Sequence, residues 1–387
     1  MTEKLRVGIL GATGMVGQRF ISLLDNHPWF EVVTLAASGR SAGQTYAAAV
    51  EGRWKMDTPI PAAVKDLVVM NVNEVEKVAA TVDFVFSAVD MTKEEIKAIE
   101  EAYAKTETPV VSNNSAHRWT PDVPMVIPEI NPQHFDVIEH QKKRLGTTRG
   151  FIAVKPNCSI QSYVPALEAW KEFEPYECVI TTYQAISGAG KDFKSWPEMV
   201  ENIIPYIGGE EEKSEQEPLK IWGHIENGEI VKAAEPKITC QCLRVPVLNG
   251  HTAAAFVKFR KKPTKEQLIE KLESYRGFPQ EAQLPPEHPE HPLLPLALVT
   301  EVVETAPPFV CEAQALRSFS VSVLPHLGQG TFSSSLDTSS SKISPHLLQR
   351  YSYMGMTILL RFRPAVRILP CRVSPSGSRV LYINSSQ

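Results

Sequence analysis

The sequence has no long apolar run and no strong excess of charge. No apolar stretch among its 387 residues reaches the length that a helix needs to cross a bilayer. The formal net charge of −4 gives no support for a role on nucleic acid or on a membrane surface. The N-terminal stretch MTEKLRVGIL enters an expected strand without a signal-peptide pattern. We therefore expect a globular protein of the cytoplasm, with no nucleic-acid or membrane partner.

Cysteine is scarce, and its spacing matches no zinc-binding pattern. The six cysteines lie at positions 158, 178, 240, 242, 311 and 371. We expect no metal site, and thiols that stay mostly reduced in the cytoplasm. Cys240 and Cys242 would lie on one side of a strand, where ordinary packing explains them. Cys158 differs, because the polar residues of KPNCSIQS surround it just after a short apolar run.

Strand and helix patterns alternate in the first part of the chain. They follow each other at 5–10, 15–25, 30–38, 82–89, 92–105 and 108–114. Thr92 and Glu95 have the spacing of a capping box at the start of a helix. Alternation of this kind is typical of an α/β fold. We predict a Rossmann-like, doubly wound parallel sheet that forms an NADP-binding domain over residues 1–133.

The pattern changes after about residue 150. Longer alternating stretches predict the strands of a second sheet at 178–187, 237–247 and 252–260. Helical patterns are fewer and fall at 162–173, 196–204 and 264–275. Pro165 should bend the first of them. We predict an α+β catalytic and dimerisation domain over residues 134–279, built on a mostly antiparallel sheet.

Residues 280–387 differ in composition from both predicted domains. They contain a single lysine, Lys342, and no acidic residue after Asp337, while serine and proline are frequent. Such a composition is typical of a disordered extension, although ILLRFRPAVRILPC is unusually apolar for one. Our interpretation is an aberrant C-terminal tail, either disordered or translated out of frame.

A glycine-rich stretch, VGILGATGMVGQ, follows the first expected strand and opens the first expected helix. Gly11 would make the tight turn, Gly14 would let the backbone approach a pyrophosphate, and Gly17 would let the helix pack closely. The helix N-terminus would supply N–H donors for the anion. A plain structural turn is the alternative. We favour dinucleotide binding because strand, turn and helix come in the required order.

The stretch AASGRSAG, after the second expected strand, indicates which dinucleotide binds. An NAD site favours an acidic residue here, but the sequence offers Ser38, Arg40 and Ser41. A guanidinium and two hydroxyls suit a 2′-phosphate. NADP is therefore the expected cofactor, and an ordinary basic loop is the alternative.

A helical pattern begins directly after Cys158. A thiol at a helix N-terminus ionises more readily, and the thiolate is a strong nucleophile. His251 follows a glycine at an expected turn and could act as general acid and base, although a structural histidine is at least as common. A hydride cofactor beside an activated cysteine predicts reduction or oxidation through a thioester.

Seven motifs in order carry a specific resemblance. They are GATGMVG, ASGRSAG, NNSAHRW, KPNCSIQS, YQAISGAG, NIIPYIGGEEEK and RVPVLNGH. Over about residues 4–278 the chain resembles the aspartate-semialdehyde dehydrogenase family, and GGEEEK resembles its archaeal and fungal branch. The resemblance implies NADP-dependent reductive dephosphorylation of L-aspartyl 4-phosphate to L-aspartate 4-semialdehyde, on the way to lysine, threonine and methionine.

The resemblance also implies a role for each matching residue. Cys158 would attack the acyl phosphate, Gln184 would orient the acyl group, and His251 would move protons. The substrate-binding residues would be Arg118, Asn157 and Lys213 for the phosphate, Arg244 for the α-carboxylate and Glu210 for the ammonium, with Glu211 competing for that last role. The expected cofactor-binding residues are Gly11, Thr13, Gly14, Met15, Val16, Gly17, Ser38, Arg40, Ser41, Ser187 and Gly188.

Beyond residue 278 the resemblance stops, because the glycine-rich segment that returns to the nucleotide-binding domain in this family is missing. A catalytically impaired chain that still pairs with intact subunits is therefore one alternative. A related acyl-CoA reductase, such as malonyl-CoA reductase, is another, and an NADP-binding sensor is a third. The resemblance implies a homodimer or homotetramer.

Overall fold

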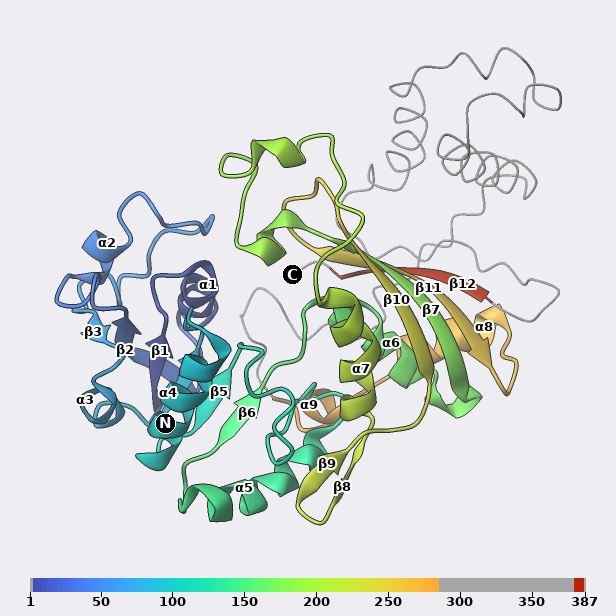
Figure 1. The fold of residues 1–387 in the computed structure, drawn as a ribbon, viewed down its shortest axis with the longest axis horizontal. Coiled ribbons are helices and arrows are strands. Elements are labelled where there is room, and N and C mark those ends of the chain that lie inside the picture. Colours follow the sequence, from blue (N-terminus) through green and yellow to red (C-terminus); the bar gives the residue numbers. More distant parts are fainter. Residues whose placement is uncertain (1–2, 285–378, 386–387) are drawn as a thin grey trace. The chain divides into compact units, whose positions relative to one another are not determined.

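The computed structural model describes residues 3–284 and 379–385. Its first layer is a sheet of six parallel strands in the order β3-β2-β1-β4-β5-β6 (Figure 1). The strands are β1 (Leu5–Leu10), β2 (Phe30–Ala37), β3 (Met70–Asn71), β4 (Phe84–Ser87), β5 (Val110–Ser112) and β6 (Ile152–Val154). This order confirms the predicted Rossmann-like, doubly wound sheet.

Helices connect these strands. They are α1 (Met15–Leu23), α2 (Tyr46–Ala49), α3 (Val75–Ala79), α4 (Lys93–Lys105), the 3-10 helix η1 (Pro132–Val137) and α5 (Ile138–Leu145). Thr92 and Glu95 form the predicted capping box at the start of α4. In β1, Val7, Ile9 and Leu10 are fully buried, as expected for a parallel strand covered on both faces.

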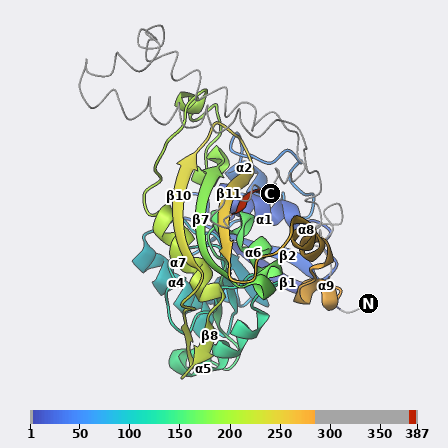
Figure 2. The ribbon, with the colours of Figure 1, turned by 90° about the vertical axis from the view of Figure 1, so that its right-hand side faces the viewer.

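The second sheet has four strands in the order β10-β7-β11-β12. They are β10 (Lys237–Arg244), β7 (Pro175–Gln184), β11 (His251–Phe259) and β12 (Arg379–Ser385), and Figure 2 shows β10, β7 and β11 side by side. β7 and β10 are parallel, whereas β11 is antiparallel to both β7 and β12. The predicted mostly antiparallel sheet is confirmed. Its consequence is that β7 and β10 end at the edge where β11 begins.

Shorter elements surround this sheet. They are η2 (Ser159–Ser162), α6 (Val164–Ala169), η3 (Lys171–Phe173), η4 (Ile186–Ala189), η5 (Pro197–Met199), α7 (Glu210–Ile221), the hairpin β8 (His224–Glu226) and β9 (Glu229–Val231), α8 (Lys265–Ser274) and α9 (Phe278–Glu281). Among the described residues, no helix is both long and apolar enough to cross a membrane.

Two predicted helices differ from the structure. The helix expected over 162–173 is interrupted at Tyr163, whose φ of −134° is not helical, and Pro165 lies in the first turn of α6 rather than bending a continuous helix. A proline is tolerated there because its missing N–H would have no partner in the first turn. The helix expected over 196–204 is only the short 3-10 helix η5.

The predicted boundaries also need correction. β6 completes the first sheet, so that sheet extends past the boundary expected at 133. Within the expected tail, Arg379–Ser385 form β12 and pair with β11. A disordered tail is therefore wrong for these seven residues, because their backbone completes a ladder. The remainder of that prediction lies almost wholly outside the described residues.

Candidate functional site

Three strand ends gather polar side chains at one edge of the second sheet. Gln184 ends β7, Arg244 is its neighbour at the end of β10, and His251 begins β11. Arg244 Nη1 donates to the carbonyl oxygen of Ala185 at 2.7 Å. All three side chains are buried. The strand directions thus bring together residues that lie far apart in the sequence.

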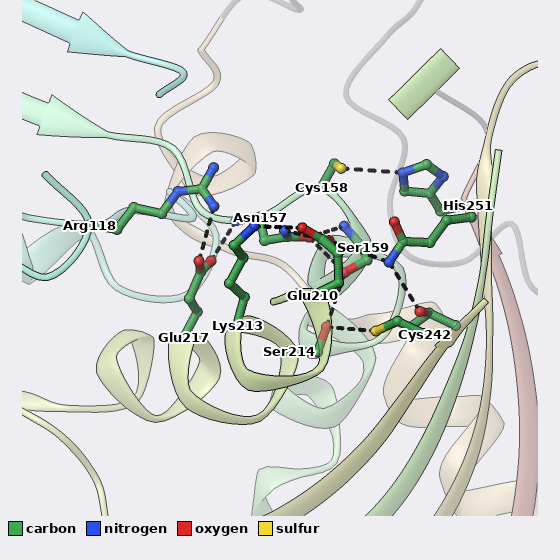
Figure 3. A network of polar contacts seen from close by, with 12 residues as sticks. Arg118, Asn157, Cys158, Ser159, Glu210, Lys213, Ser214, Glu217, Cys242 and His251 are labelled. Atoms are coloured by element: carbon green, nitrogen blue, oxygen red, sulfur yellow. Dashed lines mark hydrogen bonds and ion pairs between the residues drawn. The ribbon is translucent and has the colours of Figure 1, made fainter. Parts of the chain in front are cut away.

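Cys158, in the loop between β6 and η2, faces this edge. It lies just after β6, and its Sγ is 3.2 Å from His251 Nε2 (Figure 3). Cys158 is partly exposed, whereas the other described cysteines are buried. Since Cys158 precedes the four-residue 3-10 helix η2 rather than a full α-helix, we assign less of its activation to a helix dipole than the sequence suggested.

His251 is held in one tautomer. The Ala185 N–H donates to His251 Nδ1 at 3.0 Å, which assigns the proton of the neutral ring to Nε2, the nitrogen that faces Cys158. Burial and, to a smaller extent, the charge of Arg244 together lower the pKa of His251 to about 4, although a hydrogen bond to the backbone of Gly250 opposes the shift. The imidazole is therefore neutral near pH 7. It can donate to a thiolate or oxyanion on its Nε2 side.

The first turn of α7 adds an anion and a cation. Glu210 accepts from Lys213 Nζ at 2.7 Å and from Asn157 Nδ2 at 2.8 Å, and Gln184 Nε2 lies 3.5 Å away. Burial opposes the charge of Glu210, but these three partners together hold its pKa below the usual value. Glu211 instead lies near the backbone N–H of Cys242. The geometry thus favours Glu210 over Glu211 as the carboxylate facing Gln184.

Arg118 occupies a buried position beside the same network. Its Nη1 donates to Glu217 Oε1 at 3.0 Å, and its Nε donates to the carbonyl oxygen of Lys155 at 3.0 Å. The Asn157 amide is also engaged, since its Oδ1 accepts from the backbone N–H of Ser159 and its Nδ2 donates to Glu210. Arg118 and Asn157, two of the three expected phosphate ligands, are therefore held in place by protein contacts.

The glycine turn is explained by lack of space. Gly11 has φ +81°, and a Cβ there would stand 2.2 Å from the carbonyl oxygen of Ala88. At Gly17 a Cβ would stand 2.3 Å from the carbonyl oxygen of Gly11. At Gly14 the nearest atom would be that same oxygen, at 3.5 Å. Gly11 and Gly17 are thus required by the turn itself, whereas Gly14 leaves its face open at the N-cap of α1.

The other expected cofactor residues lie in three groups. Thr13, Met15 and Val16 lie in the glycine turn and the first turn of α1. Ser38 and Arg40 are exposed just after β2, where Ser41 is buried.

Ser187 and Gly188 lie in η4, and a Cβ at Gly188 would come within 3.0 Å of both Arg244 Nη1 and His251 Cε1. The last group therefore adjoins the catalytic edge.

Cys240 and Cys242 fit the packing interpretation. Cys240 and Cys242 lie on the same side of β10 with their sulfurs 3.7 Å apart, and both are buried. Within residues 3–284 and 379–385, no group of three or more His, Cys, Asp or Glu side chains could hold a metal ion.

Two site-related residues were not expected from the sequence. Glu217 binds Arg118, and Lys220 Nζ donates to the carbonyl oxygens of Arg118, Thr120 and Val123 at 2.8–3.0 Å. Helical spacing offered a signal, because positions four and seven after Lys213 lie on one face of α7. It did not reveal which loop that face contacts.

Comparisons with known proteins point to one family. A model of the semialdehyde dehydrogenase NAD-binding domain matches residues 6–138, and a model of the semialdehyde dehydrogenase dimerisation domain matches residues 167–303, past the boundary predicted at 279. The aspartate-semialdehyde dehydrogenase of Methanothermobacter thermautotrophicus is 40% identical over 281 residues, 72% of this chain and 78% of the relative. The one from Cryptococcus neoformans is 41% identical over 266 residues, 67% of this chain and 72% of the relative.

Solved structures show the same architecture. The crystal structure of aspartate semialdehyde dehydrogenase with NADP from Candida albicans aligns with a TM-score of 0.71 at 29% identity, over 99% of this chain and 93% of that one. Aspartate semialdehyde dehydrogenase II from Vibrio cholerae aligns with a TM-score of 0.59 at 20% identity, over 100% of this chain and 94% of that one. The second likeness supports the fold alone.

Proposed function

The chain belongs to the aspartate-semialdehyde dehydrogenase family, and from this premise we propose that it reduces L-aspartyl 4-phosphate to L-aspartate 4-semialdehyde with NADPH, through a thioester on Cys158. One observation carries the assignment of the nucleophile. The partly exposed Cys158 Sγ lies 3.2 Å from the Nε2 of a buried histidine whose other nitrogen already accepts a hydrogen bond.

The chemistry follows from this pair. The Cys158 thiolate attacks the acyl carbon, a C–S bond forms, and the bond to the phosphate oxygen breaks as inorganic phosphate leaves. When bound, NADPH supplies the hydride that reduces the thioester. His251 Nε2–H stabilises and protonates the oxyanion, and it takes this proton back as the C–S bond breaks, the aldehyde departs and the Cys158 thiolate re-forms.

The charges of the site match the substrate. L-Aspartyl 4-phosphate carries a carboxylate, an ammonium and a phosphate. Arg244 is the proposed partner of the carboxylate, through a bidentate contact, and Glu210 is the proposed partner of the ammonium. Arg118, Lys213 and Asn157 surround the proposed phosphate position. Lys213 is half-buried and paired with Glu210, so an arriving zwitterion could exchange partners with both.

The residues of the first domain fit NADP. The cradle at Gly11, Gly14 and Gly17 leaves one open face, at Gly14, where a pyrophosphate could approach the N-terminus of α1. Arg40 is exposed beyond β2 and makes no ion pair within the described part of the chain. It would hold the 2′-phosphate.

The match to a dimerisation domain supports oligomerisation. We propose a homodimer, with a homotetramer as the alternative that light scattering on the full chain would reveal. A cytoplasmic location stays a prediction from the sequence.

The deciding assay follows NADPH formation by the full-length chain. Aspartate semialdehyde, NADP and inorganic phosphate should give NADPH, and leaving out phosphate should stop turnover, because the thioester formed on Cys158 then has no phosphate to accept its acyl group. Malonate semialdehyde with coenzyme A should give none. Activity only with that second pair would favour the acyl-CoA reductase. Inactivity with both pairs, together with NADP binding, would favour an impaired chain.

A further inference from the structure

Resting on the proposed function, we propose that Glu217 is a positioning residue. It fixes the guanidinium of Arg118 for the substrate phosphate and ties it to the loop that carries Cys158. Glu217 is not expected to touch the substrate. Its role is to keep two other groups in the geometry that the reaction needs.

The contacts divide evenly between the two carboxylate oxygens. Glu217 Oε1 accepts from Arg118 Nη1 at 3.0 Å, and Oε2 accepts from the backbone N–H of Asn157 at 2.6 Å. Asn157 directly precedes Cys158. A single side chain therefore connects the proposed phosphate-binding cation with the nucleophile loop, as Figure 3 shows.

Burial makes this connection rigid. The side chains of Arg118 and Glu217 are 8% and 1% exposed, whereas those of Lys213 and Glu210 are 30% and 13% exposed. Burial raises the pKa of Glu217, while the Arg118 charge and the Asn157 N–H oppose that rise. Since both oxygens accept N–H donors, the ionised form fits the site.

A second contact from the same helix holds the Arg118 loop. Lys220, three residues after Glu217, donates to three carbonyl oxygens of residues 118–123. α7 therefore binds the Arg118 guanidinium through Glu217 and the backbone of this loop through Lys220. Its first turn carries Glu210 and Lys213. One rigid helix sets the distance between the two parts of the substrate site.

Arg118 keeps donors for an anion. A guanidinium has five N–H groups, and the contacts to Glu217, to the carbonyl oxygen of Lys155 and, at 3.5 Å, to that of Asn113 use three. The other two have no partner in the described part of the chain. Glu217 and the two carbonyl oxygens thus decide in which direction these donors point.

The test is Glu217→Gln in the full chain. The glutamine amide keeps the shape of the side chain and one acceptor oxygen. Its NH₂ group, however, must face either Arg118 Nη1 or the Asn157 N–H, both of which are donors, and the negative charge beside Arg118 is lost. We expect the KM for inorganic phosphate to rise about tenfold or more, with the KM for aspartate semialdehyde changed less than about threefold. Glu217→Asp should recover part of the loss. Glu212→Gln, on the exposed side of the same helix, is the matched control and should match wild type.

A merely structural role would give a different result. Partial unfolding lowers the number of active sites, so kcat would fall in proportion to titratable Cys158 thiol while both KM values stayed at wild type. That result would overturn the proposal. Wild-type inactivity would instead contradict the proposed function. In that case, calorimetric titration with inorganic phosphate alone tests Glu217, and equal affinity of wild type and Glu217→Gln would reject its role.

A double-mutant cycle covers the risk that Glu217→Gln folds poorly, since it leaves Arg118 buried without a counter-charge. Arg118→Gln/Glu217→Gln buries no charge at this position. If Glu217 acts through Arg118, the double variant should show the same KM for phosphate as Arg118→Gln alone. Additive effects of the two changes would contradict the proposal.

Discussion

The two parts of the site are built on different principles. The glycine turn at residues 11–17 is one contiguous stretch, and its backbone and empty space do the binding. The thiol cluster uses side chains from five separate elements of the second domain. Its members are Cys158 just before η2, Gln184 in β7, Glu210 in α7, Arg244 in β10 and His251 in β11.

This difference determines how each part fails. A backbone cradle is broken by adding an atom, because the space is already filled or is reserved for the ligand. A side-chain cluster is broken by removing a functional group, because each group has a separate task. Small additions in the first part should therefore affect binding and stability, and small deletions in the second should affect rate.

Removing the sulfur gives the largest effect. Cys158→Ala should lower NADPH formation by at least about four orders of magnitude, because no other described thiol is exposed to replace it. The affinity for NADP, measured by fluorescence titration, should stay within about threefold of wild type. Cys240→Ala, which removes a buried thiol, is the control and should keep its activity. Turnover by Cys158→Ala would contradict the nucleophile assignment.

Removing the imidazole ranks next. His251→Asn should lower kcat by about 10²- to 10⁴-fold, the usual contribution of a positioned acid–base group. In wild type, protonation of the ring would place a hydrogen on Nδ1, where it would face the hydrogen of the Ala185 N–H. Burial also lowers the pKa of His251 to about 4. The imidazole should therefore stay neutral as the pH falls from 7 to about 5. A loss of kcat/KM centred near the ordinary histidine pKa of about 6.5, and absent from His251→Asn, would contradict this.

Adding a methyl group to the turn separates packing from binding. In Gly17→Ala the new Cβ would lie 2.3 Å from the carbonyl oxygen of Gly11, so the free energy of unfolding should fall by about 2–3 kcal/mol. Gly14→Ala adds the same atom, 3.5 Å from its nearest neighbour. It should unfold like wild type yet bind NADP at least about tenfold more weakly, because the methyl group fills the face proposed for the pyrophosphate. Thermal denaturation and NADP titration of both variants decide. Normal NADP affinity in Gly14→Ala would contradict the cradle.

The same contrast explains what the sequence could predict. The glycine turn, the capping box at Thr92 and four strands of the parallel sheet depend on local patterns, so they were predictable, whereas the short strands β3 and β6 were not. The partner of Arg118 was not, since Glu217 lies 99 residues away and only the packing of α7 against that loop brings them together. The break at Tyr163 and the strand β12 likewise depend on long-range packing and pairing that no local period records.

The smallest effect should come from Arg40. Arg40→Ala removes an exposed side chain that touches neither the turn nor the thiol cluster, so stability and kcat at saturating NADP should stay close to wild type. The Kd for NADP should rise about tenfold, the usual loss for one charged contact to a phosphate, whereas the Kd for NAD, which has no 2′-phosphate, should not change. Arg19→Ala, which removes an exposed guanidinium from α1, controls for the change in net charge. If the Kd for NADP rises equally in both variants, the cofactor preference comes from the overall positive electrostatic potential and not from a contact between Arg40 and the 2′-phosphate.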